Sequence, residues 1–398
     1  MRVAQMRERE DFEAHLLATL ARGWSEQYAR EIVVSPQSIE GGVSFRTHKI
    51  LGAFYTRGLG PQGRKFLRDS LRFTPRRRRL LAQWVATDLV GHWIGLRALS
   101  DPAFWVSADL PNPEQLLVVA GNQRIRIFDF ARMRARVLLK EGFQKETMER
   151  EIMLRTSGVQ GPFHKIHAFC PQHSFFEEEL LQGWDLNRVP PWLNRKKLKK
   201  SARKLLLRWL ERTRESADRD GYLDDVAARF RKASQEVQGR FGPVFPQSER
   251  WLELLRARAA DLPTSIQLAL THGDFQWGNV FFERKISKIC LIDWEHQGKR
   301  SFHHDFFTEA LGARRGVGMA RRVSAYLEGK TLGSPIDDIG GTKRVALLAL
   351  FLLENLIFFL EESLTGPTLA PSQGLLATID ELAPFGHDLG GILGERPC

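Results

Sequence analysis

Two short polar segments carry the residues of this sequence that could do chemistry, and each follows an apolar run typical of a strand. Residues 270–280 read LTHGDFQWGNV and contain Asp274 and Asn279, whereas residues 290–295 read CLIDWE and contain Asp293. We expect the two strand ends to place these three side chains at one edge of a small sheet. Two carboxylates and an amide oxygen are hard ligands that suit Mg²⁺, which keeps several waters and is completed by substrate phosphates. The pattern therefore indicates phosphoryl transfer, which needs a metal ion, a cation on the phosphates and a group that orients the nucleophile.

Other interpretations of these residues explain less of the pattern. An isolated His-Gly-Asp could be a helix cap or a turn, but Asn279 and the second carboxylate segment follow it in the same stretch of chain. His272 alone could act as a general base, although the neighbouring Asp274 is the better candidate. His303 and His304 could bind a metal ion, yet no third ligand has a spacing that supports this.

Together the two segments resemble the aminoglycoside phosphotransferase and choline kinase-like family, whose members are relatives of the protein kinases. The family has a His-Gly-Asp-x-x-x-x-Asn loop and an Ile-Asp-Trp-Glu strand end, and the similarity extends over about residues 115–360. The matching residues here are His272, Gly273, Asp274, Asn279, Ile292, Asp293, Trp294 and Glu295.

The resemblance implies a role for each polar residue of these motifs. Asp274 would be the catalytic base or the residue that orients the acceptor hydroxyl, and Asn279 and Asp293 would hold Mg²⁺. A further family aspartate follows the second motif, and Asp305 is similar to it. His272 and Asp305 would then be structural supports of the loop.

The resemblance also implies a nucleotide site in a smaller lobe. Lys140 ends a predicted strand, as the phosphate-binding lysine of the family does, and Glu151 on the following helix would be its ion-pair partner, with Glu149 as the alternative. Residues 175–183 are similar to the hinge whose backbone binds adenine. The hinge residues predicted to contact the nucleotide are Glu178, Glu179, Leu180 and Leu181.

The elements that must position these residues predict an α+β chain with a two-lobed, protein-kinase-like fold. Helical periodicity dominates residues 1–105, which we interpret as a helical N-terminal extension. Alternating patterns predict a small, strand-rich, nucleotide-binding lobe over 106–183, and residues 184–398 read as a large, mostly helical catalytic lobe. A glycine-rich phosphate loop is not evident in the sequence.

Composition places the chain among ordinary globular proteins. It has 398 residues, 43% hydrophobic and 27% charged, which argues against a disordered or fibrous protein. Its three cysteines form no CxxC pair, so we expect a reduced, cytoplasmic protein, and Cys290 reads as a buried core residue. The charged N-terminus predicts no signal peptide. The apolar run 345–360 is interrupted by Glu354 and Asn355 and predicts a buried helix rather than a membrane span.

The basic excess is concentrated in one segment. Residues 188–214 contain 11 basic residues against one acid, Glu211, in a chain whose net charge is +12. Apolar residues recur there at helical spacing, so the segment predicts a basic amphipathic helix. Two interpretations stay open: a face over 195–214 that docks on an anionic membrane, or an ordinary solvated face whose lysines extend over apolar neighbours.

The sequence therefore predicts a phosphotransferase that uses ATP and Mg²⁺ to phosphorylate a hydroxyl of a small molecule or glycan. The basic charge favours an anionic or membrane-borne acceptor, such as a lipid-linked or cell-surface glycan precursor. No nucleic acid partner is expected, and the cytoplasmic location would include the inner face of the membrane. The alternatives are a kinase-fold binding or regulatory protein without catalysis and a choline- or aminoglycoside-type metabolite kinase. A protein kinase is disfavoured because His-Gly-Asp replaces His-Arg-Asp.

Overall fold

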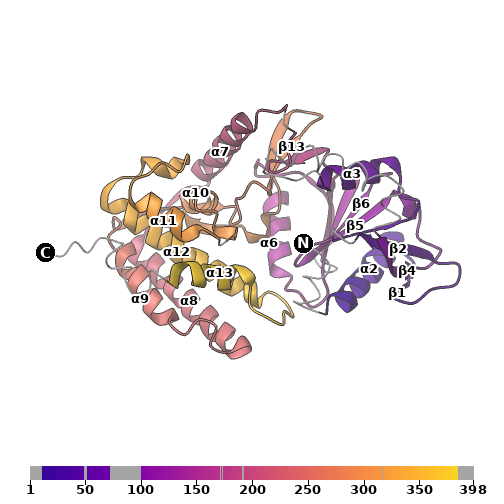
Figure 1. Ribbon diagram of the computed structural model, residues 1–398, viewed down its shortest axis with the longest axis horizontal. Helices are drawn as coiled ribbons and strands as arrows, with labels where there is room; N and C mark the ends of the chain where they lie inside the picture. Colours follow the sequence, from indigo (N-terminus) through magenta and orange to yellow (C-terminus); the bar gives the residue numbers. More distant parts are fainter. Residues whose placement is uncertain are drawn as a thin grey trace. The chain divides into compact units, whose positions relative to one another are not determined.

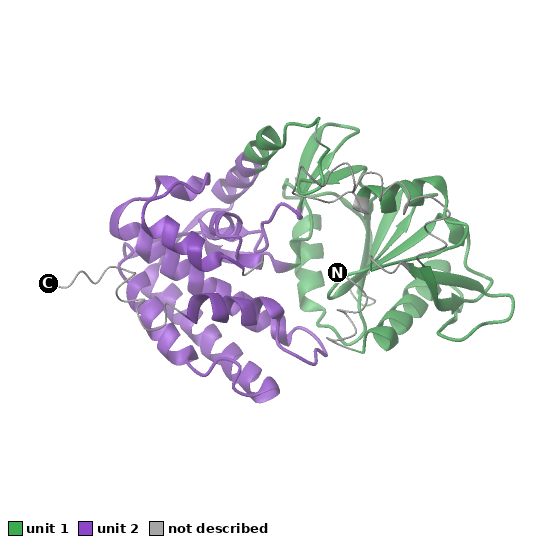
Figure 2. Cartoon of the chain, in the orientation of Figure 1, with its two compact units in different colours: residues 1–202, 280–295 green, residues 203–279, 296–398 purple. Residues whose placement is uncertain are grey.

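The chain forms two compact units in the computed structural model (Figure 1). The structure describes residues 11–48, 52–71, 100–170, 172, 174–190, 192–315 and 317–383. Unit 1 comprises residues 1–202 and 280–295, and unit 2 comprises residues 203–279 and 296–398 (Figure 2). The α+β class predicted from the sequence is confirmed. The division differs from the predicted boundary at residue 183, because a later hairpin pairs with residues 183–185 and belongs to unit 1.

A nine-stranded antiparallel sheet forms the centre of unit 1. Its strands lie in the order β1-β4-β2-β3-β5-β6-β7-β9-β8. Their bounds are β1 Val34–Ser35, β2 Val43–His48, β3 Ala53–Thr56, β4 Ser100–Val106, β5 Leu116–Ala120, β6 Arg124–Asp129, β7 Arg134–Leu139, β8 Ile166–Cys170 and β9 Phe175–Glu179.

The N-terminal segment is only partly helical, which corrects the prediction of a helical extension. Helices α2 (Phe12–Tyr28) and α3 (Pro61–Leu71) are present, but four strands of the same segment continue the sheet beyond β5. The rings of Phe45 and Phe104 stack there with centroids 5.1 Å apart. Because these strands add to a shared sheet, the segment is part of unit 1 rather than an appendage.

Helices cover both faces of this sheet. Alternate residues of β5 and β6, including Val118, Ile125 and Ile127, join the core that contains Phe12 and Leu16 of α2. The opposite face is covered by α3 and by α6 (Glu146–Thr156), and Figure 1 shows α2 and α3 on either side of β5 and β6. This two-sided packing fixes which side of the sheet each polar residue faces.

A second, three-stranded sheet completes unit 1. Its order is β10-β13-β14, with β10 at Gly183–Asp185, β13 at Val280–Glu283 and β14 at Lys288–Leu291. A single 3-10 turn, Trp294–His296, follows β14. The sheet thus connects the segment after β9 to the loop that holds Asp293.

Unit 2 is mostly helical around the buried helix α12 (Gly341–Leu364). Residues 346–360 of α12 are almost all buried, which confirms the predicted core helix. No helix within the described ranges is both long and apolar enough to cross a membrane. A sheet of β11 (Glu215–Asp218), β12 (Ser265–Thr271) and β15 (Gly298–Ser301) lies in this unit. The other helices are α8 Arg219–Phe241, α9 Ser248–Ala259, α10 His304–Ala310, α11 Met319–Leu327 and α13 Gln373–Leu382, and α7 Arg195–Arg212 spans the boundary between the units.

Candidate active site

The loop after β12 is held by a buried carboxylate. Asp305, in the first turn of α10, accepts the backbone N–H of His272 at 2.7 Å and that of Gly273 at 2.9 Å. Both Asp305 and His272 are fully buried, and the His272 ring accepts the backbone N–H of Asp274 at 3.3 Å. These contacts make Asp305 and His272 structural supports that fix the backbone on either side of Gly273.

Three neighbouring side chains orient the Asp274 carboxylate. Arg314 Nε donates to Oδ1 at 3.1 Å, Asn279 Nδ2 donates to Oδ2 at 2.7 Å, and Gln276 Nε2 lies within 3.2 Å of both oxygens. Asn279 Nδ2 also donates to the backbone carbonyl of Asp274 at 2.9 Å. Because both donations come from the amide nitrogen, the Asn279 side-chain oxygen points away from Asp274 and is the atom that could bind a cation.

Arg314 is a site residue that the sequence analysis missed. Its side chain is 6% exposed, it donates to Asn355 Oδ1 at 2.6 Å and to the Gly273 carbonyl, and it lies over the Phe358 ring at 3.4 Å. Burial lowers the pKa of Arg314 to about 10, against the opposing charge of Asp274. The sequence carries no signal for this contact, because Arg314 is 40 residues from Asp274 and belongs to no motif.

A second buried carboxylate supports the same region through β15 and α10. Glu354 of α12 accepts the Tyr222 hydroxyl at 2.6 Å, the backbone N–H of Ser301 at 2.7 Å, and contacts His304 Nδ1 at 2.8 Å. His304 is adjacent to Asp305, so the carboxylate in the core helix fixes the start of the helix that holds the loop. The polar interruption of the apolar run 345–360 is therefore explained by this network.

Gly273 is expected to tolerate no side chain. Its φ is +80°, and an added Cβ would lie 2.1 Å from the carbonyl oxygen of His296. We expect Gly273→Ala to cost about 1–2 kcal/mol for the left-handed backbone and about 1–3 kcal/mol more for the overlap. Gly242→Ala is the matched control, because its φ is also +80° but its Cβ would meet no atom within 4 Å. Equal thermal unfolding midpoints for the two variants would contradict this expectation.

Asp293 lies in unit 1, in the turn that follows β14. Its φ is +70°, in the left-handed region that few residues other than glycine, asparagine and aspartate adopt. Its Oδ1 accepts Arg126 Nη2 at 2.8 Å. Val280 pairs with Leu291, so Asn279, just before β13, and Asp293, just after β14, lie at the same end of one sheet, whereas Asp274 follows β12, which pairs with β11 and β15. The predicted placement at one sheet edge therefore holds for Asn279 and Asp293 but not for Asp274.

Glu151 has arginine partners where the sequence predicted a lysine. Its carboxylate forms a salt bridge with Arg124 of β6 and accepts Arg155 Nη1 at 2.9 Å. Burial acts to raise the pKa of Glu151, but the charges of Arg124 and Arg155 outweigh burial and hold this pKa below its ordinary value. Arg124 Nε also lies 3.0 Å from Glu295 Oε2, so the cluster reaches the Ile-Asp-Trp-Glu segment.

Lys140 faces the other side of the sheet. Its ammonium lies 5.1 Å from the ring centroid of Phe12 in α2, 5.5 Å from that of Phe143, and donates to the Asn122 carbonyl at 2.8 Å. Only 1% of Lys140 is exposed. Lys140, which follows Leu139 in the pleat, therefore points toward α2, whereas Glu151 projects from α6 on the opposite face of the sheet, where it contacts Arg124.

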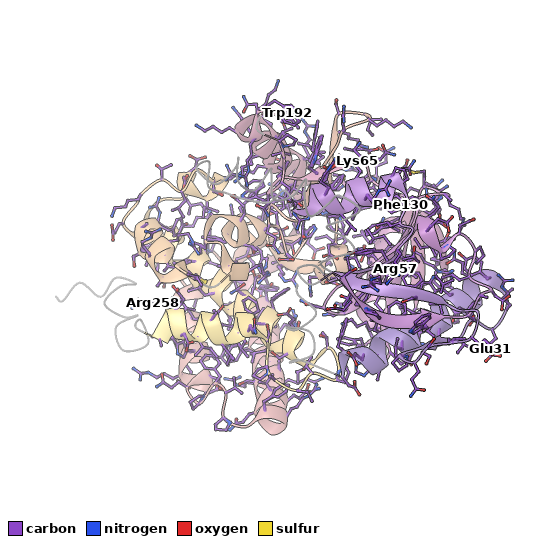
Figure 3. The ribbon with its side chains drawn as sticks, turned by 45° about the vertical axis from the view of Figure 1, so that its right-hand side comes forward. Glu31, Arg57, Lys65, Phe130, Trp192 and Arg258 are labelled. Carbon is purple, nitrogen blue, oxygen red and sulfur yellow. The ribbon has the colours of Figure 1, made fainter. Side chains whose placement is uncertain are left out.

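The predicted hinge borders a cavity of about 540 Å³ in unit 1. The Leu180 N–H donates to the Met133 carbonyl at 3.1 Å, and Glu178 accepts Arg155 Nη2 at 2.6 Å, so Glu178 is engaged within the arginine cluster. Glu179 ends β9 with an exposed side chain. The walls combine hinge, aromatic and cationic residues, and Figure 3 labels two of them, Lys65 and Phe130. The wall residues used below are Lys65, Phe66, Phe130, Leu180, Leu181 and Trp184.

One protein-family model matches the region that contains the His272–Asn279 loop. Residues 174–330 match the model of the phosphotransferase enzyme family, APH. The match confirms the resemblance predicted from the motifs. It spans the predicted hinge, both motifs and Asp305, and the description of the family agrees with the predicted phosphotransferase chemistry. No curated protein matches the chain significantly.

Similar solved structures come from small-molecule kinases. An ethanolamine kinase of Plasmodium vivax is 13% identical, with 80% of this chain and 93% of that chain covered and a TM-score of 0.43. Choline kinase LicA of Streptococcus pneumoniae is 12% identical, with 68% and 90% covered and a TM-score of 0.41. An aminoglycoside-3'-phosphotransferase of type VIII is 15% identical, with 62% and 94% covered and a TM-score of 0.40.

Proposed function

We propose that this protein transfers a phosphoryl group from ATP to a hydroxyl of a small molecule or glycan, with Mg²⁺ as the metal ion. The observation that carries the proposal is the Asp274 carboxylate, fixed by Arg314, Asn279 and Gln276 on a loop anchored by Asp305. A carboxylate held in one orientation is suited to orient an acceptor hydroxyl and to take its proton.

The residues assigned to the metal have the right chemistry for magnesium. Asp293 offers a carboxylate and Asn279 an amide oxygen turned away from Asp274. Within the described residues no group of three or more His, Cys, Asp or Glu side chains is placed to hold a metal ion. This donor set suits Mg²⁺, which takes one or two carboxylates and completes its shell with water and phosphate oxygens. When bound, the ion would neutralise charge on the transferring phosphoryl group.

The cavity beside the hinge is the proposed site of the nucleotide base. Its apolar walls include Phe66, Phe130 and Trp184, and Leu180 and Leu181 contribute the hinge side. A flat aromatic base gains stability from such walls by burial and by offset stacking. The lining also carries charge, with the cations Lys65, Arg188, Arg284 and Lys285 and the carboxylates Asp69 and Asp185.

The test is ADP release combined with identification of the product. We would incubate the protein with ATP and Mg²⁺ in a metabolite and glycolipid extract and search by mass spectrometry for a new phosphate ester. An ester that forms with wild type and is lost with Asp274→Asn would support the proposal. ATP binding without any transferred phosphate would favour the alternative of a binding or regulatory protein. A choline or aminoglycoside ester would identify a metabolite kinase instead.

A lipid-linked or cell-surface glycan precursor is the acceptor favoured by charge. Helix α7 presents several exposed lysines, whereas Ala202, Leu206 and Trp209 on its other side are buried. Each cation near an anionic membrane contributes about 1 kcal/mol, so we expect the wild type to sediment with anionic liposomes at low salt. Replacing the exposed lysines by Glu should abolish this sedimentation without unfolding the protein. The lysines to replace are Lys196, Lys197, Lys200 and Lys204.

A matched variant separates this helix from net charge. Four exposed cations of unit 2 outside α7 can be reversed in the same way, and these changes should leave liposome binding largely intact. These are Lys232, Arg250, Arg321 and Lys343. If the wild type fails to bind liposomes even at low salt, α7 is an ordinary solvated helix and the membrane-borne acceptor loses its support.

A further inference from the structure

We propose that Arg126, with Arg124 beside it on β6, binds the phosphates of the nucleotide in the place predicted for Lys140. The inference rests on the proposed function and names the cations of that site. Three observations support it: the register of the sheet, the buried salt bridges of Arg124 and the contact of Arg126 with Asp293.

The register of the sheet puts both arginines on one face. Arg126 pairs with Val119 of β5 and with Val137 of β7, and paired residues point to the same side of a sheet. Val137 packs under α6 and Val119 packs against the core under α3. Arg124, two residues earlier, shares this face, which is also the face of Glu151.

Arg124 is held rigidly and keeps an unused donor. Its side chain is 3% exposed, and its charge is balanced by Glu151 and Glu295. Within the part of the chain that the structure describes, its buried Nη2 has no hydrogen-bond partner. A buried donor without a partner is costly in a folded protein and indicates a position at which a ligand can bind.

Arg126 reaches the surface beside the proposed metal ligand. Its side chain is 28% exposed, and its Nη2 donates to Asp293 Oδ1 at 2.8 Å. A phosphate at Asp293 would therefore meet a guanidinium group that is already fixed in place. Guanidinium groups bind phosphate through paired N–H donors, which gives both charge and orientation.

Lys140 cannot serve this face in the same way. It is buried against Phe12 of α2 on the opposite side of the sheet and donates to the Asn122 carbonyl. Glu151, which the sequence predicted as its partner, instead fixes Arg124. Glu151 of α6 thus fixes Arg124 of β6, the strand that pairs with β7. The cation beside Glu151 is therefore an arginine of β6 rather than the lysine that follows β7.

The test compares nucleotides that differ in phosphate number. Affinities of adenosine, ADP and ATP would be measured by calorimetry without added metal for wild type, Arg126→Met, Arg126→Lys and Lys140→Met. Arg132→Met is the control for loss of one positive charge, because Arg132 lies in the turn between β6 and β7 with its side chain 51% exposed. Thermal unfolding would verify that each variant is folded.

We expect Arg126→Met to weaken ATP and ADP binding at least tenfold, with adenosine binding unchanged and Arg126→Lys recovering part of the loss. Lys140→Met and Arg132→Met should bind ATP within about threefold of wild type. Wild-type affinity for ATP in Arg126→Met, or an equal loss in Lys140→Met, would overturn the inference. A wild type that binds neither ATP nor adenosine would instead contradict the proposed function itself.

Discussion

Asp274→Asn is expected to bind ATP with near wild-type affinity and to lose phosphoryl transfer by about 10²-fold or more, the range for loss of a general base. Asparagine keeps the shape of the carboxylate and can still accept a hydrogen bond from Asn279 or Arg314, but it cannot accept a proton. Calorimetry for ATP and a single-turnover measurement of product formation would separate the two effects. A large loss of ATP affinity would mean that Asp274 has a different role.

The substitution also affects folding, and a second variant controls for this. Arg314 is almost fully buried beside Asp274, and an uncompensated buried charge costs about 3–5 kcal/mol. In the double variant Asp274→Asn with Arg314→Gln both partners are neutral, so the unfolding midpoint should recover relative to Asp274→Asn alone. Transfer should stay low in the double variant, because the base is still missing. Recovery of transfer together with stability would show that Asp274 acts only through the fold.

The local parts of this site could be predicted from the sequence because they are continuous in the chain. The segment from His272 to Asn279 places Asp274 and its amide partner five residues apart in one loop, and their contact depends on that loop alone. The alternating patterns over 106–183 predicted strands, and β6 and β7 are present there; β7 ends at Leu139, one residue before Lys140, which was predicted to end a strand. Asp305 was predicted through the family resemblance rather than from any physical pattern.

The contacts that sequence analysis missed join distant segments. Arg314 meets Asp274 only because unit 2 folds as it does, and nothing near residue 314 distinguishes it from a surface arginine. The side to which Lys140 points could not be predicted for a related reason: strand alternation predicts that neighbouring residues face opposite sides of a sheet, but not which side faces α6. The side chain of Leu139 packs against α6, so that of Lys140 points toward α2.

The N-terminal strands show how a weak local pattern can mislead. Residues 43–48 read VSFRTH, which alternates, but the segment is short and lies among helical patterns. The strand is stabilised by pairing with β4, more than 50 residues away, so its stability comes from tertiary contact. A single sequence contains no measure of that pairing.

Asp293→Asn is expected to abolish Mg²⁺-dependent turnover, with a loss of at least about 10²-fold, since each 1.36 kcal/mol of lost transition-state stabilisation is tenfold in rate. Asparagine is the informative replacement because it tolerates the left-handed conformation at φ +70° that Asp293 adopts. Asp293→Ala should be equally inactive but less stable. Asn279→Ala should lose less activity, because it removes a neutral ligand rather than a charged one. ADP release measured against Mg²⁺ concentration gives all three effects.

The control is Asp109→Asn, which removes an exposed carboxylate of the same unit and should leave turnover unchanged. Asp293→Asn also removes the negative charge paired with Arg126, although the asparagine oxygen can still accept its hydrogen bond. ATP binding without metal should therefore hold or improve in Asp293→Asn while turnover disappears. That opposite response distinguishes a metal ligand from a residue that merely fixes the loop, whose loss would weaken both. Near-normal turnover of Asp293→Asn would contradict the site assignment, because Mg²⁺ binding would then depend on a different carboxylate.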